Sequence, residues 1–125
     1  MKGRAHLSLA SVFVCALTAC HGQSMALVGD MTCPNVEYQC PSPAPSFSAQ
    51  VQPIIDQHCN ACHITGGAAP DRLLTTYAEV FKYWMPSFTA VYSCIMPPAA
   101  DVVDQLSPSD RQTLLQWLAC GAPNN

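Results

Sequence analysis

Five consecutive residues constrain this chain more than any other feature, namely Cys59-Asn60-Ala61-Cys62-His63. Two thiols three residues apart lie on the same side of a helical turn, and the next residue adds an imidazole. Three reactive side chains therefore leave one turn of backbone together. Any fold of this chain therefore has to leave room beside that turn for the group that these three side chains bind.

The Cys-x-x-Cys-His pattern is the attachment motif of c-type haem. The two thiols can reach the two vinyl groups on one edge of a porphyrin and become thioethers, and the histidine then lies beneath the iron. A redox-active dithiol, a zinc site and a Cys59–Cys62 disulfide are the alternatives. The first would need a βαβ context and the second a fourth ligand, and neither is visible. The sequence therefore predicts one covalent haem c, held by Cys59, Cys62 and His63.

Residues 1–19 are predicted to be a signal peptide, because a basic start precedes an apolar stretch. The stretch ends at Leu17-Thr18-Ala19-Cys20, which resembles the lipobox of bacterial lipoproteins. The resemblance implies that Cys20 is lipidated and becomes the new N-terminus. A plain signal cleaved after Ala26 is the alternative. Because His21 follows the cysteine in place of Asp, we expect a lipid-anchored protein of the cell envelope, at the outer membrane and facing the periplasm.

Charge and hydropathy exclude several classes of partner. The chain of 125 residues has a net charge of −3, which excludes an electrostatically driven nucleic-acid binder. No apolar run reaches the roughly 18 to 20 residues of a membrane-spanning helix. The lipid is therefore the expected membrane contact. Export also places the cysteines where disulfides persist.

Residues 20–46 are expected to be the lipidated N-terminus and an extended, unpacked tether, because their last part is rich in proline. Cys33 and Cys40 are expected to close a small loop within this tether. Cys94 and Cys120 are expected to form a second disulfide that fastens the loop before Met96 to the last helix. A Cys33–Cys120 disulfide and free thiols are the alternatives.

The remaining residues predict three helices and no strand, so the expected fold class is mostly α. The first helix spans about 48–60, where Val51, Ile54, Ile55 and His58 recur at helical spacing. We expect His58 to be partly exposed. The second begins at Thr76 with a capping box and stops at Pro86. The third follows the N-cap Ser107 and ends before Gly121.

A methionine is the expected second iron ligand. Met96 is favoured, because Pro97 and Pro98 directly after it fix an extended loop and restrict the ligand. Met85 is the other candidate, but it ends an amphipathic helix and is expected to pack in the core. Arg72 and Lys82 are candidates to neutralise a haem propionate.

Residues 47–125 resemble a monohaem class I cytochrome c domain. The resemblance rests on Cys59–His63, on Met96-Pro97-Pro98, and on Trp117 followed by Gly121-Ala122-Pro123. It implies crossed N- and C-terminal helices with Trp117 near their contact. It also implies that the carbonyl of Pro70 accepts the second ring N–H of His63. The first helix lacks the glycine–aromatic pair that is usual in this family.

Iron ligated by both His63 and Met96 has no open position for a substrate, and a soft neutral methionine favours Fe(II). The sequence therefore predicts a single-electron carrier at a membrane surface, with redox proteins as partners and no enzyme activity. Two alternatives remain. One is a haem enzyme or gas sensor from which Met96 dissociates, and the other is a haem subunit of a larger respiratory assembly.

Overall fold

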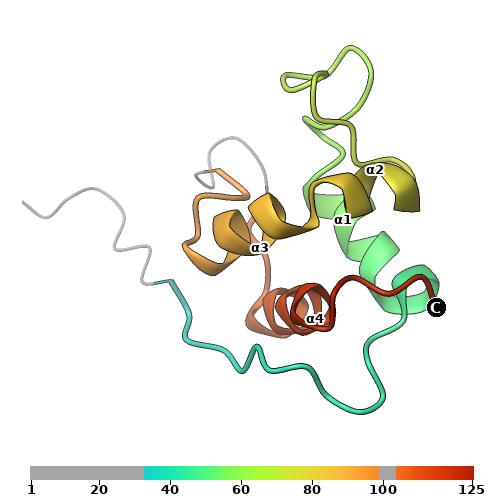
Figure 1. Cartoon of the computed structure of the whole chain (residues 1–125). Coiled ribbons are helices and arrows are strands. Elements are labelled where there is room, and N and C mark those ends of the chain that lie inside the picture. The colour runs from blue at the N-terminus through green and yellow to red at the C-terminus, as the bar shows by residue number, and fades with distance from the viewer. Residues whose placement is uncertain (1–32, 99–103) are drawn as a thin grey trace, which may run out of the picture. The chain divides into compact units, whose positions relative to one another are not determined.

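The computed structural model describes residues 33–98 and 104–125, and its regular structure is helical (Figure 1). The elements are a π-helix η1 and four α-helices: η1 (Phe47–Val51), α1 (Gln52–His58), α2 (Tyr77–Lys82), α3 (Trp84–Tyr92) and α4 (Pro108–Ala119). These residues contain no strand, which confirms the expected mostly α class. Within them, no helix has the length and apolar character needed to span a bilayer. The predicted signal peptide and Cys20 lie outside the described residues.

The first predicted helix is observed as η1 followed directly by α1. Ser46 caps η1 and accepts a hydrogen bond from the Ala49 amide at 3.3 Å. The amides of Gln50 and Val51 both donate to the Ser46 carbonyl, at 3.0 and 3.1 Å. Pro53 follows at the start of α1, where its missing N–H breaks no helical hydrogen bond. The widened turn thus leads into α1 without a gap.

The second predicted helix is observed as two helices. The capping box at its start is confirmed, because the Glu79 amide donates to the Thr76 hydroxyl at 3.4 Å and the Glu79 carboxylate accepts from the Thr76 amide at 2.9 Å. α2 then ends at Lys82, and α3 begins at Trp84. The prediction that Pro86 stops the helix is wrong. Pro86 lies in the first turn of α3, where a proline is tolerated because that turn has unpaired N–H groups.

The last helix begins and ends as predicted. The Asp110 amide donates to the Ser107 hydroxyl at 3.1 Å, and Gly121 follows the helix with a φ of 81°. Trp117 is fully buried, and its ring centroid lies 5.4 Å from that of Phe47. Trp117 therefore lies at the contact between α4 and η1. The buried core comprises Phe47, Val51, Ile54, Ile55, Val80, Val91, Leu114, Leu115, Trp117, Leu118 and Ala122.

Residues 33–46 precede η1 without helical structure (Figure 1). Both disulfide pairings predicted for this region are wrong. Cys33 is bonded to Cys94, and Cys40 is bonded to Cys120, with S–S distances of 2.02 and 1.99 Å. The local loop fails because the segment is extended, so that each of its cysteines meets a different part of the helical domain.

The segment also packs, contrary to the expectation of a free tether. Val36 is partly buried against the core, and Pro45 is buried. At its end, the Phe47 amide donates to the Asn125 side chain at 2.9 Å. Residues 33–46 therefore belong to the helical domain.

Candidate functional site

An apolar cavity of about 430 Å³ lies among the four α-helices, and Cys59, Cys62, His63 and Met96 all line it. The sequence predicts these four residues as one site, and the structure brings them together. Each of the four α-helices contributes apolar side chains to the walls: Ile55, Val80, Ala90, Val91, Leu114 and Leu118. A flat, largely apolar ligand would be held by such walls, while the few polar groups would fix its orientation.

The two thiols leave the turn that follows α1. The amides of Cys62 and His63 both donate to the Cys59 carbonyl, at 3.1 and 3.0 Å, so the turn is closed within the motif. Both cysteines are free and partly buried. Burial, with a smaller contribution from the charge of Asp56, raises the pKa of the Cys59 thiol to about 11. Cys59 is therefore a neutral thiol at neutral pH, unlike the thiolate of a redox-active dithiol.

His63 is oriented by a backbone carbonyl. Its Nδ1 lies 2.8 Å from the Arg72 carbonyl oxygen. A carbonyl can only accept, so Nδ1 carries the proton and Nε2 keeps the lone pair that a metal needs. The expected acceptor was the Pro70 carbonyl, and that prediction is wrong by two residues. The path of the chain explains this difference, because residues 64–74 fold back onto the motif. The Leu74 amide donates to the His63 carbonyl at 3.0 Å, which brings Arg72 beside the imidazole ring.

Gly67 allows this return of the chain. Its neighbour Ala69 donates to the Cys62 carbonyl at 3.0 Å. A Cβ atom at residue 67 would lie 2.3 Å from the same carbonyl oxygen, which is closer than any side chain can approach. Glycine is therefore required where residues 64–74 fold back onto the motif.

Met96 reaches the cavity from the loop of residues 94–98, called the Met96 loop below. Its amide and that of Ile95 both donate to the Ala90 carbonyl near the end of α3, at 3.1 and 2.9 Å. Met85 is 56% exposed and does not line the cavity, so the expectation that it packs in the core is wrong. α3 begins only at Trp84, and its first turn leaves Met85 on the outer side.

His58 is a further residue of the cavity, and the exposure predicted for it from the sequence is wrong. It was expected to be partly exposed, but it is buried and lines the cavity. Its Nδ1 lies 2.9 Å from the Asp104 carbonyl oxygen and carries the proton for the same reason as His63. The signal was present, because His58 follows Ile54 and Ile55 at helical spacing and shares their buried face.

The two cations that were candidates for neutralising a propionate occupy different positions. Arg72 lines the cavity and pairs with Asp71 at 3.3 Å, with its side chain 59% exposed. Lys82 does not line the cavity, and its ammonium nitrogen lies 5.1 Å from the centre of the Tyr83 ring. Of the two, Arg72 is the one that lines the cavity.

Three observations bear on the alternatives for the motif. Residues 33–98 and 104–125 contain no group of three His, Cys, Asp or Glu side chains arranged to hold a metal ion, which zinc would need. Cys59 and Cys62 are not bonded to each other. The strands of a thioredoxin-like dithiol site are missing from the same residues. Comparisons of the chain with known protein families, curated proteins and solved structures found no match.

Proposed function

We propose that this chain is a single-electron carrier that holds one haem c through Cys59 and Cys62, with His63 and Met96 as axial ligands. The observation that supports this most strongly is that all four side chains line one apolar cavity. Met96 is distant from the motif in the sequence, and only the fold brings it there.

The residues present fit this cofactor. A volume of about 430 Å³ lies within the range of about 300 to 1,000 Å³ that is typical of cofactor pockets. Both thiols are free to form thioethers. The lone pair of His63 is on Nε2, because Nδ1 donates to the Arg72 carbonyl. Apolar walls suit the faces of a porphyrin, and the haem would supply a one-electron iron couple.

The chain's own groups then determine what the site can do. The Arg72 carbonyl fixes the tautomer of His63 and makes its imidazole a stronger donor. The neutral thioether of Met96 favours the reduced state. The largely apolar lining of the cavity would limit the reorganisation that accompanies a change of charge on the haem. If His63 and Met96 both bind the iron, no ligand position would stay open for a substrate, so the site would suit electron transfer and not substrate binding.

The proposed setting is the cell envelope, with redox proteins as partners. Lipidation at Cys20 would anchor the chain, at the outer membrane and facing the periplasm. The 12 residues between Cys20 and Cys33, which make 13 steps from one Cα atom to the next, could span at most about 45 Å if fully extended. The cavity would thus stay near the membrane surface.

The ligand assignment is tested by optical spectra of the haem-loaded protein. Met96→Ala should abolish the methionine–iron charge-transfer band, while the covalent haem is kept. Met85→Ala is the matched control, because Met85 is an exposed methionine outside the cavity. Unchanged ligation in Met96→Ala would defeat the assignment. Colour that acidified organic solvent extracts from the unaltered protein would defeat covalent attachment.

Two further measurements test the haem-enzyme alternative and the lipid anchor. Rapid turnover of peroxide by the unaltered protein would favour a haem enzyme over a carrier. For the anchor, Cys20→Ala should release the protein from membranes, and Cys15→Ala should leave it there. Retention of Cys20→Ala in the membrane fraction would count against lipidation.

A further inference from the structure

Arg111 is a buried cation on α4 that the proposed electron transfer does not use. Arg111 is only 5% exposed. Among the described residues no carboxylate pairs with it, since the ion pair found there joins Arg72 and Asp71. A buried guanidinium is tolerated only where its N–H groups find acceptors. The acceptors of Arg111 therefore indicate which parts of the fold it holds.

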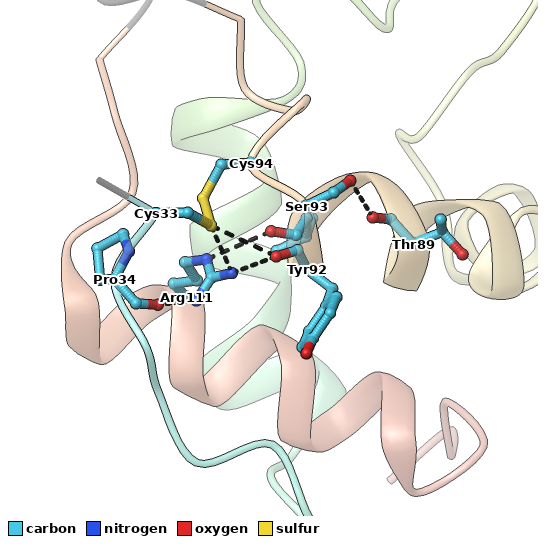
Figure 2. The surroundings of a disulfide bond; sticks show 8 residues. Cys33, Pro34, Thr89, Tyr92, Ser93, Cys94 and Arg111 are labelled. Atoms are coloured by element: carbon cyan, nitrogen blue, oxygen red, sulfur yellow. Dashed lines mark hydrogen bonds between the residues drawn. A yellow bond between two sulfur atoms is a disulfide. The ribbon is translucent and has the colours of Figure 1, made fainter. Parts of the chain in front are cut away.

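The guanidinium reaches two parts of the chain that are far apart in the sequence, the end of α3 and the segment at Cys33 and Pro34 (Figure 2). Nε donates to the Val91 carbonyl at 3.3 Å, and Nη2 donates to the Tyr92 carbonyl at 2.6 Å. Nη2 also lies 3.0 Å from the sulfur of Cys33, which is bonded to Cys94. Nη1 donates to the Pro34 carbonyl. One side chain thus joins the end of α3, the Cys33–Cys94 disulfide and the N-terminal segment.

The end of α3 is also where the Met96 loop begins. The last carbonyls of a helix lack intrahelical donors and carry the negative end of its dipole, so a cation is favoured there. Arg111 serves the carbonyls of Val91 and Tyr92. The carbonyl just before them, that of Ala90, holds the amide of Met96 at 3.1 Å. The backbone of Met96 is therefore attached to the same turn that Arg111 holds.

Cys94 lies between the end of α3 and Met96, and its backbone conformation needs support from its surroundings. Its φ of 54° is a left-handed conformation, which is unfavourable for a residue with a Cβ atom. The conformation persists where surrounding contacts impose it. The disulfide fixes the Cys94 side chain from one direction, and Arg111 contacts the partner sulfur of that disulfide and the residues just before Cys94.

We propose that Arg111 is a positioning residue for Met96, which fixes the end of α3 and the Cys33–Cys94 disulfide so that the Met96 loop presents its thioether to the cavity. The proposal rests on the proposed function, in which Met96 is an iron ligand. It assigns to α4 a role in ligation that the motif residues do not indicate. If the end of α3 were loosened, His63 would stay in place and only the bond between Met96 and the iron would be weakened.

The test compares Arg111→Lys and Arg111→Met with the control Gln112→Met in the haem-loaded protein. Gln112 is the next residue on α4, is partly exposed, and its side chain makes no hydrogen bond within the described residues. Imidazole is titrated as a competitor for the position of Met96, and the methionine–iron band is followed. Far-UV circular dichroism reports the helices, and amide hydrogen exchange at Ile95 and Met96 reports the loop without reference to the haem.

We expect imidazole to bind the Arg111 variants at least about tenfold more tightly, the factor that corresponds to one lost charge-assisted hydrogen bond. Exchange at Ile95 and Met96 should accelerate while the helical signal is kept, and Gln112→Met should behave as the unaltered protein. The imidazole affinity of Arg111→Lys should lie between those of the unaltered protein and Arg111→Met, because an ammonium group cannot donate to all the acceptors at once. If Arg111→Met does not fold, the lysine variant decides the question alone.

Two results would overturn the proposal. One is an imidazole affinity and a loop exchange rate in Arg111→Lys equal to those of the unaltered protein. The other is weaker ligation that appears only together with loss of the helical signal, which would make Arg111 merely structural. A missing methionine band in the unaltered protein would instead refute the proposed ligation. In that case, faster amide hydrogen exchange at Ile95 and Met96 in the variants would still show that Arg111 holds the Met96 loop. Its role in positioning an iron ligand would be rejected.

Discussion

The two disulfides permit a matched comparison, because removing either should cost the same stability, whereas only one should affect Met96. The first variant carries Cys33→Ser with Cys94→Ser, and the second carries Cys40→Ser with Cys120→Ser. The Cys33–Cys94 bond ends two residues before Met96. The Cys40–Cys120 bond lies after the last turn of α4, away from the Met96 loop.

The expected loss follows from the chain entropy of the unfolded state. The bonds join residues 61 and 80 apart, and alone they would stabilise by about 4.3 and 4.5 kcal/mol. When the other disulfide is intact, the two cysteines of each pair are already linked by a shorter covalent path. This path runs over the 7 steps from Cys33 to Cys40, through the remaining disulfide, and over the 26 steps from Cys94 to Cys120. A loop of about 33 residues corresponds to about 3.7 kcal/mol. That path is common to both variants, so the predicted loss is the same for each.

Guanidinium unfolding followed by far-UV circular dichroism measures the loss, and imidazole titration of the haem-loaded protein measures the hold on Met96. Both variants should lose up to about 3.7 kcal/mol of unfolding free energy. Imidazole should displace Met96 more readily only in the variant that lacks Cys33–Cys94. The second variant provides the control for general destabilisation.

Either of two outcomes would refute this reasoning. Losses of unfolding free energy that differ by more than about 2 kcal/mol would show that the shared covalent path does not govern the unfolded state. Equal imidazole affinity in the two variants would show that the position of the Cys33–Cys94 bond next to the Met96 loop has no effect on ligation.

Three further changes test other parts of the structure. Gly67→Ala places a Cβ 2.3 Å from the Cys62 carbonyl oxygen, so we expect a markedly lower yield of covalent haem protein, measured as colour that resists acidified solvent. Thr76→Ala removes the cap of α2 and should cost about 1 kcal/mol in urea unfolding, and no change would show that α2 is held by packing alone. Hydrogen bonds, chiefly from Thr75, lower the pKa of Glu79, so its contribution to stability is complete above the unfolded pKa of about 4.3 and is lost as the pH falls through the lower folded value. Glu79→Gln should flatten that acid dependence in thermal melts, and an unchanged slope would assign the dependence to other carboxylates.

Local signals predicted the starts of α2 and α4 correctly, because a cap is a contact between near neighbours. Ser107 and Thr76 each accept from an amide three residues on, and the structure shows both contacts. The same local rules failed at Pro86. A proline can end one helix or begin the next, and the sequence does not show that one helix ends at Lys82 and the next begins at Trp84.

The site was predictable to the extent that it is local. Cys59, Cys62 and His63 leave one turn, so the sequence could group them, and the proline pair after Met96 added the fourth residue. The disulfide partners could not be found, since four cysteines permit three pairings and the sequence does not choose among them. The acceptor for His63 was missed by two residues because the return of the loop depends on tertiary hydrogen bonds such as that from Leu74 to the His63 carbonyl.

The two crossed disulfides also determine how the chain would respond to being pulled. Cys33 is covalently linked to Cys120 by only 7 residues of backbone and the Cys40–Cys120 bond. Even a fully unravelled molecule would lengthen between these points by no more than about 25 Å. Tension applied through the N-terminus would therefore bypass residues 41–119, and the motif at 59–63 would stay slack while the ends of the chain are stretched.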